Sequence, residues 1–238
     1  MKIEVLYPEV CNLYGDLGNI RYLKKTCPQI EVRQTGLNEK PMFSQEVPDL
    51  IYMGSMTEKS QITVLNRLGK YRDRIEKLID EGARFLITGN GLELFGKRIE
   101  DKDGTVVECL GIFDTIAVRD MMNRFNSLYL GTFEGMKIVG YKSQFTHSRH
   151  DGGSSVRGLF MTDRGPGLNP DVKEEGIRKN NFMATYLLGP LLILNPPFTK
   201  YLLKQCGIDN SPAFETEAMD AYITRVKEFS EPDRGFYY

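Results

Sequence analysis

Both histidines of the chain lie in one polar segment beyond its middle. His147 and His150 are followed by Asp151 and then by glycines, so residues 144–153 are expected to form a loop. Imidazole nitrogens and a carboxylate can hold a metal ion, and they can also exchange protons with a substrate. The segment is therefore a candidate metal or acid–base site, and a solvent-exposed loop without chemistry is the alternative.

A second segment has the architecture of a nucleophile site. Residues 85–88 are expected to form a short buried strand, Gly89-Asn90-Gly91 a tight turn, and residues 92–95 the first turn of a helix. In several hydrolases such an elbow presents the nucleophile, and its glycines allow a positive φ and close backbone approach. The turn of this chain contains no Ser, Cys or Thr. Thr88 precedes the turn. As the last residue of the strand, it is expected to point its side chain to one face of the sheet, and no histidine lies near it in sequence.

The segment after the first expected strand is the third candidate. Residues 12–19 contain two glycines and several turn-forming polar residues just before a helix expected over residues 20–25. The start of a helix can accept an anion, and a purely structural turn is the alternative. Cys11 adjoins this loop, and its apolar neighbours favour a packed thiol over a reactive one.

Composition favours one soluble domain over residues 1–238. The chain has 238 residues, 41% of them hydrophobic, and a formal net charge of −1. This charge balance gives no indication of a nucleic-acid partner or a membrane surface. The four cysteines are widely spaced, no signal peptide is evident, and no apolar run reaches about 20 residues. We therefore expect a cytoplasmic protein with reduced thiols.

The elements that must position these residues alternate in the first part of the chain. Strands are expected over residues 2–7, 30–34, 49–53 and 85–88, and a helix capped by Ser55 or Thr57 has apolar positions from 62 to 79. This order predicts a mainly parallel sheet with helices on both faces, which binds ligands at the carboxyl ends of its strands. The loop at Gly54 and the elbow at Gly89 both lie at such ends.

From residue 104 onward, the spacing of hydrophobic residues no longer indicates alternating strands and helices. Short strands expected over residues 106–110, 115–118, 127–130 and 137–141 predict an antiparallel extension of the α/β fold. After a hairpin near residues 164–167, we expect a last strand over 182–187 and closing helices over 198–206 and 215–229.

Three motifs together resemble one family, the class I glutamine amidotransferases of the CobB/CobQ type, and most closely their GatD-like glutaminase subunits. The opening Asn12-Leu13-Tyr14-Gly15-Asp16-Leu17-Gly18-Asn19 resembles the family's Asn-Leu-Tyr-Gly-Asp-Arg-Gly-Asn. The closing Thr185-Tyr186-Leu187-Leu188-Gly189-Pro190 resembles Thr-Tyr-Leu-His-Gly-Pro, and the elbow falls where the family has Cys-Gly-Gly-Tyr-Gln. The resemblance extends over nearly the whole chain and implies a flavodoxin-like fold.

For chemistry, the resemblance implies hydrolysis of glutamine by a Cys nucleophile with a His base, and transfer of ammonia to a synthetase partner. This chain has Gly89 at the Cys position and Leu188 at the His position. Of the family's Gly-rich loop, only Gly54 and the acidic Glu58 match, and Gln144 stands at the position of a further histidine. Arg124 lies near the position of the family's arginine for the glutamine carboxylate.

These departures predict a pseudo-glutaminase without cofactor, which acts as a binding or regulatory subunit of a Mur-ligase-like or other ATP-dependent amide-forming ligase. The candidate residues for binding glutamine or a small anion are Gly54, Asn90, Gly91, Glu93 and Arg124. One alternative is an active enzyme of the cobyric acid synthase or lipid II isoglutaminyl synthase group with a changed mechanism, which uses the His147–His150–Asp151 loop together with Arg124 and Glu93 around the same pocket. The other alternative is a purely structural subunit.

Overall fold

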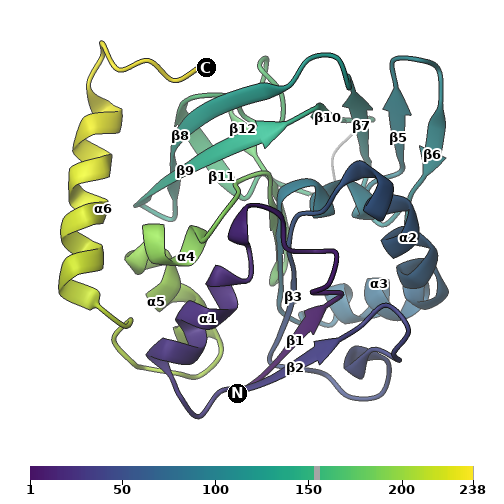
Figure 1. Cartoon of the computed structure of the whole chain (residues 1–238), viewed down its shortest axis with the longest axis horizontal. Helices are drawn as coiled ribbons and strands as arrows, with labels where there is room; N and C mark the ends of the chain where they lie inside the picture. The colour runs from purple at the N-terminus through teal and green to yellow at the C-terminus, as the bar shows by residue number, and fades with distance from the viewer. Residues whose placement is uncertain (153–155, 238) are drawn as a thin grey trace.

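A six-stranded sheet forms the centre of the molecule in the computed structural model, which describes residues 1–152 and 156–237 (Figure 1). Its strand order is β13-β14-β4-β3-β1-β2, and only β13 is antiparallel to its neighbour. The strands are β1 (Lys2–Leu6), β2 (Glu31–Thr35), β3 (Leu50–Met53), β4 (Phe85–Thr88), β13 (Ile177–Lys179) and β14 (Phe182–Thr185). The predicted parallel sheet is confirmed.

Helices cover both faces of this sheet because its buried strands are apolar at successive positions. Side chains alternate between the two faces of a strand, so Phe85 and Ile87 of β4 pack in the cluster with α2 (Glu58–Leu68) and α3 (Arg72–Asp80). Leu86 packs on the opposite face, in the cluster with α1 (Gly18–Thr26), α4 (Leu191–Leu194) and α5 (Pro196–Gln205).

The expected helix through residue 79 is interrupted. Thr57 caps α2, because its side chain accepts a hydrogen bond from the Ser60 amide. The 3-10 turn η3 (Gly69–Tyr71) then separates α2 from α3. The buried residues of this region therefore belong to two separate helices. Further 3-10 turns are η1 (Leu13–Gly15), η2 (Met42–Ser44) and η4 (Gly89–Phe95).

The antiparallel extension consists of two further four-stranded sheets. One has the order β10-β7-β5-β6, from β5 (Arg98–Asp101), β6 (Val106–Glu108), β7 (Thr115–Arg119) and β10 (Thr146–His150). The other has the order β12-β11-β8-β9, from β8 (Phe125–Phe133), β9 (Met136–Gln144), β11 (Phe160–Arg164) and β12 (Glu174–Glu175). All pairings are antiparallel except that of β5 with β7. The last helix, α6 (Glu215–Ser230), packs beside β8 and β9 (Figure 1).

One sequence prediction is wrong in this region. Most of the expected loop over residues 144–153 is strand β10, which pairs with β7 so that His147 lies opposite Val118 and His150 opposite Thr115. Residue 153 lies outside the described residues. The alternation of polar side chains along β10 looks like a loop in the sequence, yet Thr146 and Ser148 are buried within the layer.

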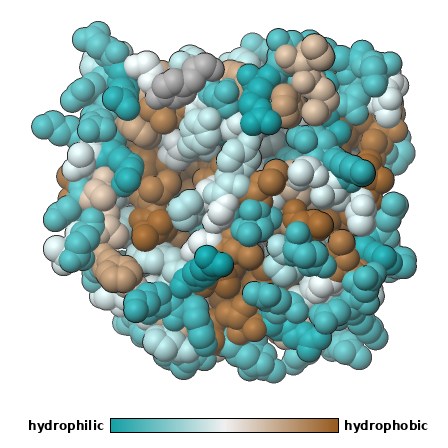
Figure 2. Space-filling view, in the orientation of Figure 1, coloured by the Kyte–Doolittle hydropathy of each residue, from teal (hydrophilic) through white to brown (hydrophobic). Residues whose placement is uncertain are grey.

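The surface seen in Figure 2 is mainly hydrophilic, with apolar side chains gathered in separate groups between polar ones. Such scattered apolar exposure is usual for a folded chain. Within the described residues, none of the helices combines the length and the apolar character that crossing a membrane requires.

Candidate functional site

A cavity of about 300 Å³ opens at the carboxyl ends of β3, β4 and β14. The segments that follow these strands form one side of it, and η1 and the segments around β8, β9 and β10 form the other. Its lining includes Leu13, Tyr14, Ser55, Met56, Thr57, Glu58, Gly89, Asn90, Glu93, Arg124, Ser143, Gln144, Phe145, Thr146, Tyr186 and Leu188. This is the edge at which parallel sheets bind ligands, as the sequence predicted.

The elbow after β4 has a glycine at its apex and no nucleophile. Gly89 has φ +62°, a conformation that L side chains rarely adopt. A Cβ at this position would lie 2.4 Å from the Cβ of Ser55 and 2.9 Å from Cδ2 of Leu188. The space that a nucleophile at the apex would need is therefore filled from two sides. The residues after the apex form the 3-10 turn η4 instead of the expected α-helix.

The backbone amides beside the elbow are already bound. The Ser55 amide donates to Asp16 Oδ2 at 2.5 Å, and the Met56 amide donates to Asn90 Oδ1 at 3.0 Å. Asn90 also donates from Nδ2 to the Met56 carbonyl at 2.8 Å, which joins the two loops. An oxyanion hole requires donors that point at the reacting oxygen. These two amides are engaged inside the protein, and burial raises the pKa of Asp16 to about 6.

Gly54 and Gly91 lie behind the cavity wall. A Cβ at Gly54 would lie 2.5 Å from the Cys11 carbonyl oxygen, so only glycine fits between these two backbone segments. A Cβ at Gly91 would lie 3.0 Å from Cγ2 of Ile87. Of the five predicted ligand-binding residues, Asn90, Glu93 and Arg124 line the cavity, and the two glycines shape the wall.

Glu93 is a buried carboxylate on the cavity floor. Its Oε2 accepts a hydrogen bond from Gln61 Nε2 at 2.9 Å and lies 3.6 Å from Arg119 Nη2. Its Oε1 accepts a hydrogen bond from the Tyr186 hydroxyl at 3.3 Å. Burial raises the pKa of Glu93, and the hydrogen bond from Gln61 and the charge of Arg119 act against this shift. The floor thus combines a carboxylate with donors that hold it in place.

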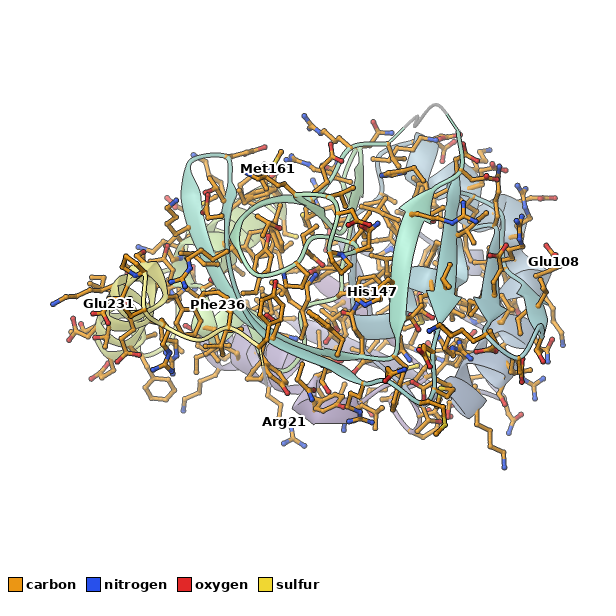
Figure 3. The ribbon with its side chains drawn as sticks, turned by 90° about the horizontal axis from the view of Figure 1, so that it is seen from above. Arg21, Glu108, His147, Met161, Glu231 and Phe236 are labelled. Atoms are coloured by element: carbon orange, nitrogen blue, oxygen red, sulfur yellow. The ribbon has the colours of Figure 1, made fainter. Side chains whose placement is uncertain are left out.

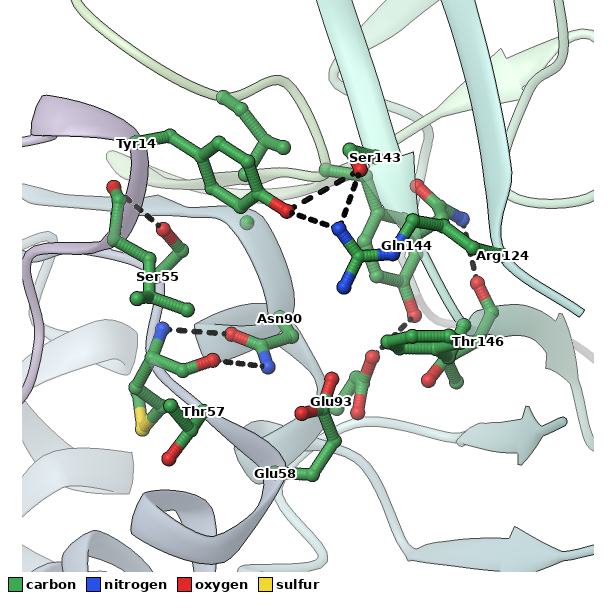
Figure 4. A pocket seen from close by; sticks show the side chains of 16 residues that line it. Tyr14, Ser55, Thr57, Glu58, Asn90, Glu93, Arg124, Ser143, Gln144 and Thr146 are labelled. Carbon is green, nitrogen blue, oxygen red and sulfur yellow. Dashed lines mark hydrogen bonds between the residues drawn. The ribbon is translucent and has the colours of Figure 1, made fainter. Parts of the chain in front are cut away.

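Arg124 lies at the mouth of the cavity. Its guanidinium stacks over the Phe145 ring at 4.5 Å and donates to the Tyr14 hydroxyl at 3.0 Å, and that hydroxyl also contacts Ser143 Oγ at 3.2 Å (Figure 4). Across the described residues, no carboxylate forms an ion pair with Arg124. The guanidinium is therefore positioned by neutral groups and can bind an anionic ligand.

The histidine set predicted from the sequence is not brought together. His147 and His150 are three residues apart on β10 and so point to opposite faces of its sheet. His147 lies in the middle of the molecule in Figure 3, 5.2 Å from the Phe125 ring, and neither histidine lines the cavity. Asp151 instead pairs with Lys97 at 3.0 Å. Within residues 1–152 and 156–237, no group of three His, Cys, Asp or Glu side chains could hold a metal ion.

Two alternative nucleophiles are also buried away from the cavity. The Thr88 hydroxyl contacts the Tyr52 hydroxyl at 3.3 Å, and Cys11 packs with its Sγ 4.0 Å from Met56 Sδ. Burial raises the pKa of the Cys11 thiol far above its usual range. Both residues support the packing of the site from behind.

Sequence reasoning missed Ser55, Tyr14 and the buried pair Lys142–Glu175 as parts of this region. Lys142 Nζ lies 3.3 Å from Glu175 Oε1, and both side chains are inaccessible to solvent. Tyr186 connects this pair to the cavity, because its amide donates to Glu175 and its hydroxyl to Glu93. Ser55 lies in the Gly54 loop, where the sequence indicated only a possible helix cap and a departure from the family's Gly-rich loop. Its place in the family's Gly-rich loop was the available signal.

The chain is similar to known proteins over most of its length. Residues 2–195 match the model of the CobB/CobQ-like glutamine amidotransferase domain. The chain belongs to this family. It is 28% identical over 211 residues to the lipid II isoglutaminyl synthase (glutamine-hydrolyzing) subunit GatD of Staphylococcus aureus, covering 88% of this chain and 85% of that protein. It is 24% identical over 229 residues to the subunit of the same name from Streptococcus pneumoniae, covering 90% and 86%.

Solved structures agree on the fold. A glutamine amidotransferase superposes with a TM-score of 0.54 at 18% identity, over 87% of this chain and 99% of that chain. A glutamine amidotransferase from Thermotoga maritima also gives a TM-score of 0.54, at 11% identity over 95% and 94%. The fold is therefore the flavodoxin-like α/β fold of class I glutamine amidotransferases.

Proposed function

We propose that this chain is a glutamine amidotransferase-like subunit that does not hydrolyse glutamine and that serves an ATP-dependent amide-forming ligase as a binding or regulatory subunit. The observation that carries the proposal is the contact at the elbow. Ser55 and Leu188 fill the space beside Gly89 in which a nucleophile would have to lie.

Attack on a side-chain amide needs a nucleophile, a base and donors for the developing oxyanion. Gly89 supplies no nucleophile, and Leu188 cannot accept a proton. The Ser55 hydroxyl is the nearest substitute, but it donates to the Leu13 carbonyl at 3.1 Å, and neither His nor Cys is found in the cavity lining given above. Because nucleophile and base act as a unit, the loss of both removes most of the rate enhancement.

The subunit role is supported by the relatives. Both are named as subunits of a glutamine-hydrolysing synthase, and the chain matches about 85% of the length of each. A domain that has this fold but no glutaminase chemistry can still act by binding, through its surface or through its pocket. The changed mechanism that would use His147 and His150 is not supported, because neither histidine lies at the cavity.

The partner can be tested by using the intact chain as bait and assaying the captured complex for ATP-dependent amide formation. With ammonium as the nitrogen donor, we expect the complex to form the amide. With glutamine as the only donor, we expect no product above the background without donor. Amide formation from glutamine would contradict the loss of hydrolysis, and capture of no ATP-dependent ligase would contradict the subunit role.

A further inference from the structure

A second pocket lies at the carboxyl ends of β1 and β2, and its lining differs from that of the cavity at Gly89. Tyr7, which directly follows β1, and residues 37–40, which follow β2, form one part of it. The end of α2 and the turn η3 form the other part. Its volume of about 250 Å³ is below the usual range for sites of larger organic ligands, so a ligand that fits it is small.

Three cations of this pocket lack an acidic partner. Across residues 1–152 and 156–237, neither Lys40 nor Lys70 forms an ion pair or a side-chain hydrogen bond. The Arg67 guanidinium has a neutral partner, since its Nη2 donates to Asn38 Oδ1 at 3.0 Å. That hydrogen bond joins the end of α2 to the loop after β2, so the three positive charges gather around one small space.

Glu39 contributes a carboxylate to the same pocket, but this group is engaged within its own loop. Its Oε2 accepts a hydrogen bond from the Gly36 amide at 3.2 Å and lies 4.0 Å from Arg33 Nη2. The lining therefore carries three positive charges against one negative charge that is already partly neutralised. Such an excess attracts an anion.

Tyr7 adds a buried donor that has no partner. Its side chain is 1% exposed, and its hydroxyl forms no hydrogen bond within the described part of the chain. Burial raises the pKa of this hydroxyl, the Tyr71 hydroxyl adds to the shift and the charge of Arg67 acts against it, so the hydroxyl lies near both of these pocket residues. Tyr7 also has φ +53°, a conformation that tyrosine rarely adopts. An unpaired donor and backbone strain both cost stability, and both are typical of positions kept for a ligand.

We propose that this pocket binds a phosphate group. Arg67, Lys40 and Lys70 bind its oxygens by charge, and the Tyr7 hydroxyl donates a hydrogen bond to one of them. A phosphate has more acceptor oxygens than a carboxylate, which suits a lining in which donors predominate. The phosphate comes either from the free ion or from a small phosphate ester, whose remainder extends toward solvent. This inference goes beyond the proposed function and does not depend on it, because the two sites have separate linings.

A ligand series tests the proposal on the intact chain. Calorimetric titration at constant ionic strength compares inorganic phosphate, glycerol 3-phosphate, acetate and glycerol, and urea unfolding is measured with each. We expect both phosphate compounds to bind at millimolar concentration or below and to raise the unfolding midpoint, acetate to bind at least tenfold more weakly, and glycerol to give no signal. Tighter binding of inorganic phosphate supports the free ion, and tighter binding of glycerol 3-phosphate supports an ester. Acetate that binds as tightly as phosphate, or phosphate that gives neither heat nor a shift in midpoint, would overturn the proposal.

Two variants locate the site. Tyr7→Phe removes only the unpartnered hydroxyl, so it should weaken phosphate binding at least tenfold while the stability without phosphate does not fall. Arg67→Gln should also weaken binding at least tenfold. The controls are Tyr22→Phe, which removes a hydroxyl that donates to the Ala213 carbonyl at 2.9 Å, and Arg21→Gln, at an exposed position of α1. Phosphate binding that is unchanged in both pocket variants, or equally weakened in the controls, would contradict the assignment of the site.

Discussion

The Cβ of Ser55 lies 2.4 Å from the point where a Cβ on Gly89 would lie. Two non-bonded carbons do not approach so closely, so the two positions cannot both carry a side chain with this backbone. Ser55 thus excludes a nucleophile at the elbow by contact as well as by the absence of one in the sequence. Restoring a catalytic cysteine requires a change at both positions.

The contact predicts the cost of a side chain at the elbow. Gly89→Ala should lower the free energy of unfolding by about 2–6 kcal/mol, because strain at a positive φ and overpacking each cost about 1–3 kcal/mol. Urea unfolding measures this difference. Gly111→Ala is the matched control, since Gly111 has the same φ of +62° but nothing within 4 Å of its Cβ position. Equal losses at the two sites would show that Ser55 does not crowd the elbow.

Asp16 predicts a pH dependence of stability. Burial raises its pKa from 3.8 to about 6, so the folded protein binds a proton more tightly than the unfolded chain does. This contribution to stability is therefore complete below about pH 3.8 and is lost as the pH rises through about 6. The loss amounts to about 3 kcal/mol, since each pKa unit corresponds to about 1.36 kcal/mol.

Asp16→Asn isolates this effect, because an amide oxygen can still accept the hydrogen bond from the Ser55 amide. Urea unfolding of both proteins between pH 4 and pH 7 should show the variant gaining stability relative to the native chain as the pH rises. A difference that stays constant over this range would mean that Asp16 titrates normally.

The buried pair Lys142–Glu175 predicts a large coupling energy. Lys142→Met leaves the Glu175 carboxylate buried without its cation and should cost about 3–5 kcal/mol. Glu175→Gln alone leaves the ammonium unpaired, and the double variant should cost clearly less than the sum of the single variants. A double-mutant cycle by urea unfolding measures the coupling. Additive single effects would mean that the two charges do not depend on each other.

The cysteines are expected to be unreactive in the folded protein. Burial raises the pKa of Cys109 to about 12 and that of Cys206 to about 11, and it raises the pKa of Cys11 further. Since the thiolate is the reactive form, alkylation by iodoacetamide at pH 7.5 should be slow in the native state and fast in urea. Rapid modification of Cys11 in the folded protein, located by peptide mass, would indicate that a reactive thiol lies at the site.

The fold could largely be predicted from the sequence because its signals are local. Strand, turn and glycine at residues 85–91 define the elbow, and the alternation of strands and helices defines the parallel sheet. Strand β10 was missed because its buried side chains, Thr146 and Ser148, are polar and have no apolar alternation. Residues 92–95 were expected to begin a helix, and the spacing of apolar residues does not distinguish an α-helix from the 3-10 turn η4 that they form.

The site could be predicted only in part, because its decisive contacts join distant segments. Gly89 and Leu188 were identified through the resemblance, whereas the overlap of Ser55 with the Gly89 position is a distance that no periodicity reveals. The pairing of Lys142 with Glu175 is equally long-range. His147 and His150 looked like a cluster because they are close in sequence, and a strand separates residues at that spacing.

Ammonia release from glutamine tests the central claim most directly. The native chain is compared with Ser55→Gly/Gly89→Cys/Leu188→His, which supplies nucleophile and base and removes the side chain that blocks the elbow, and with Gly89→Cys/Leu188→His, which keeps the block. We predict no release above background from the native chain or the double variant, and measurable release from the triple variant. Release by the native chain, with a rate proportional to its concentration, would contradict the account.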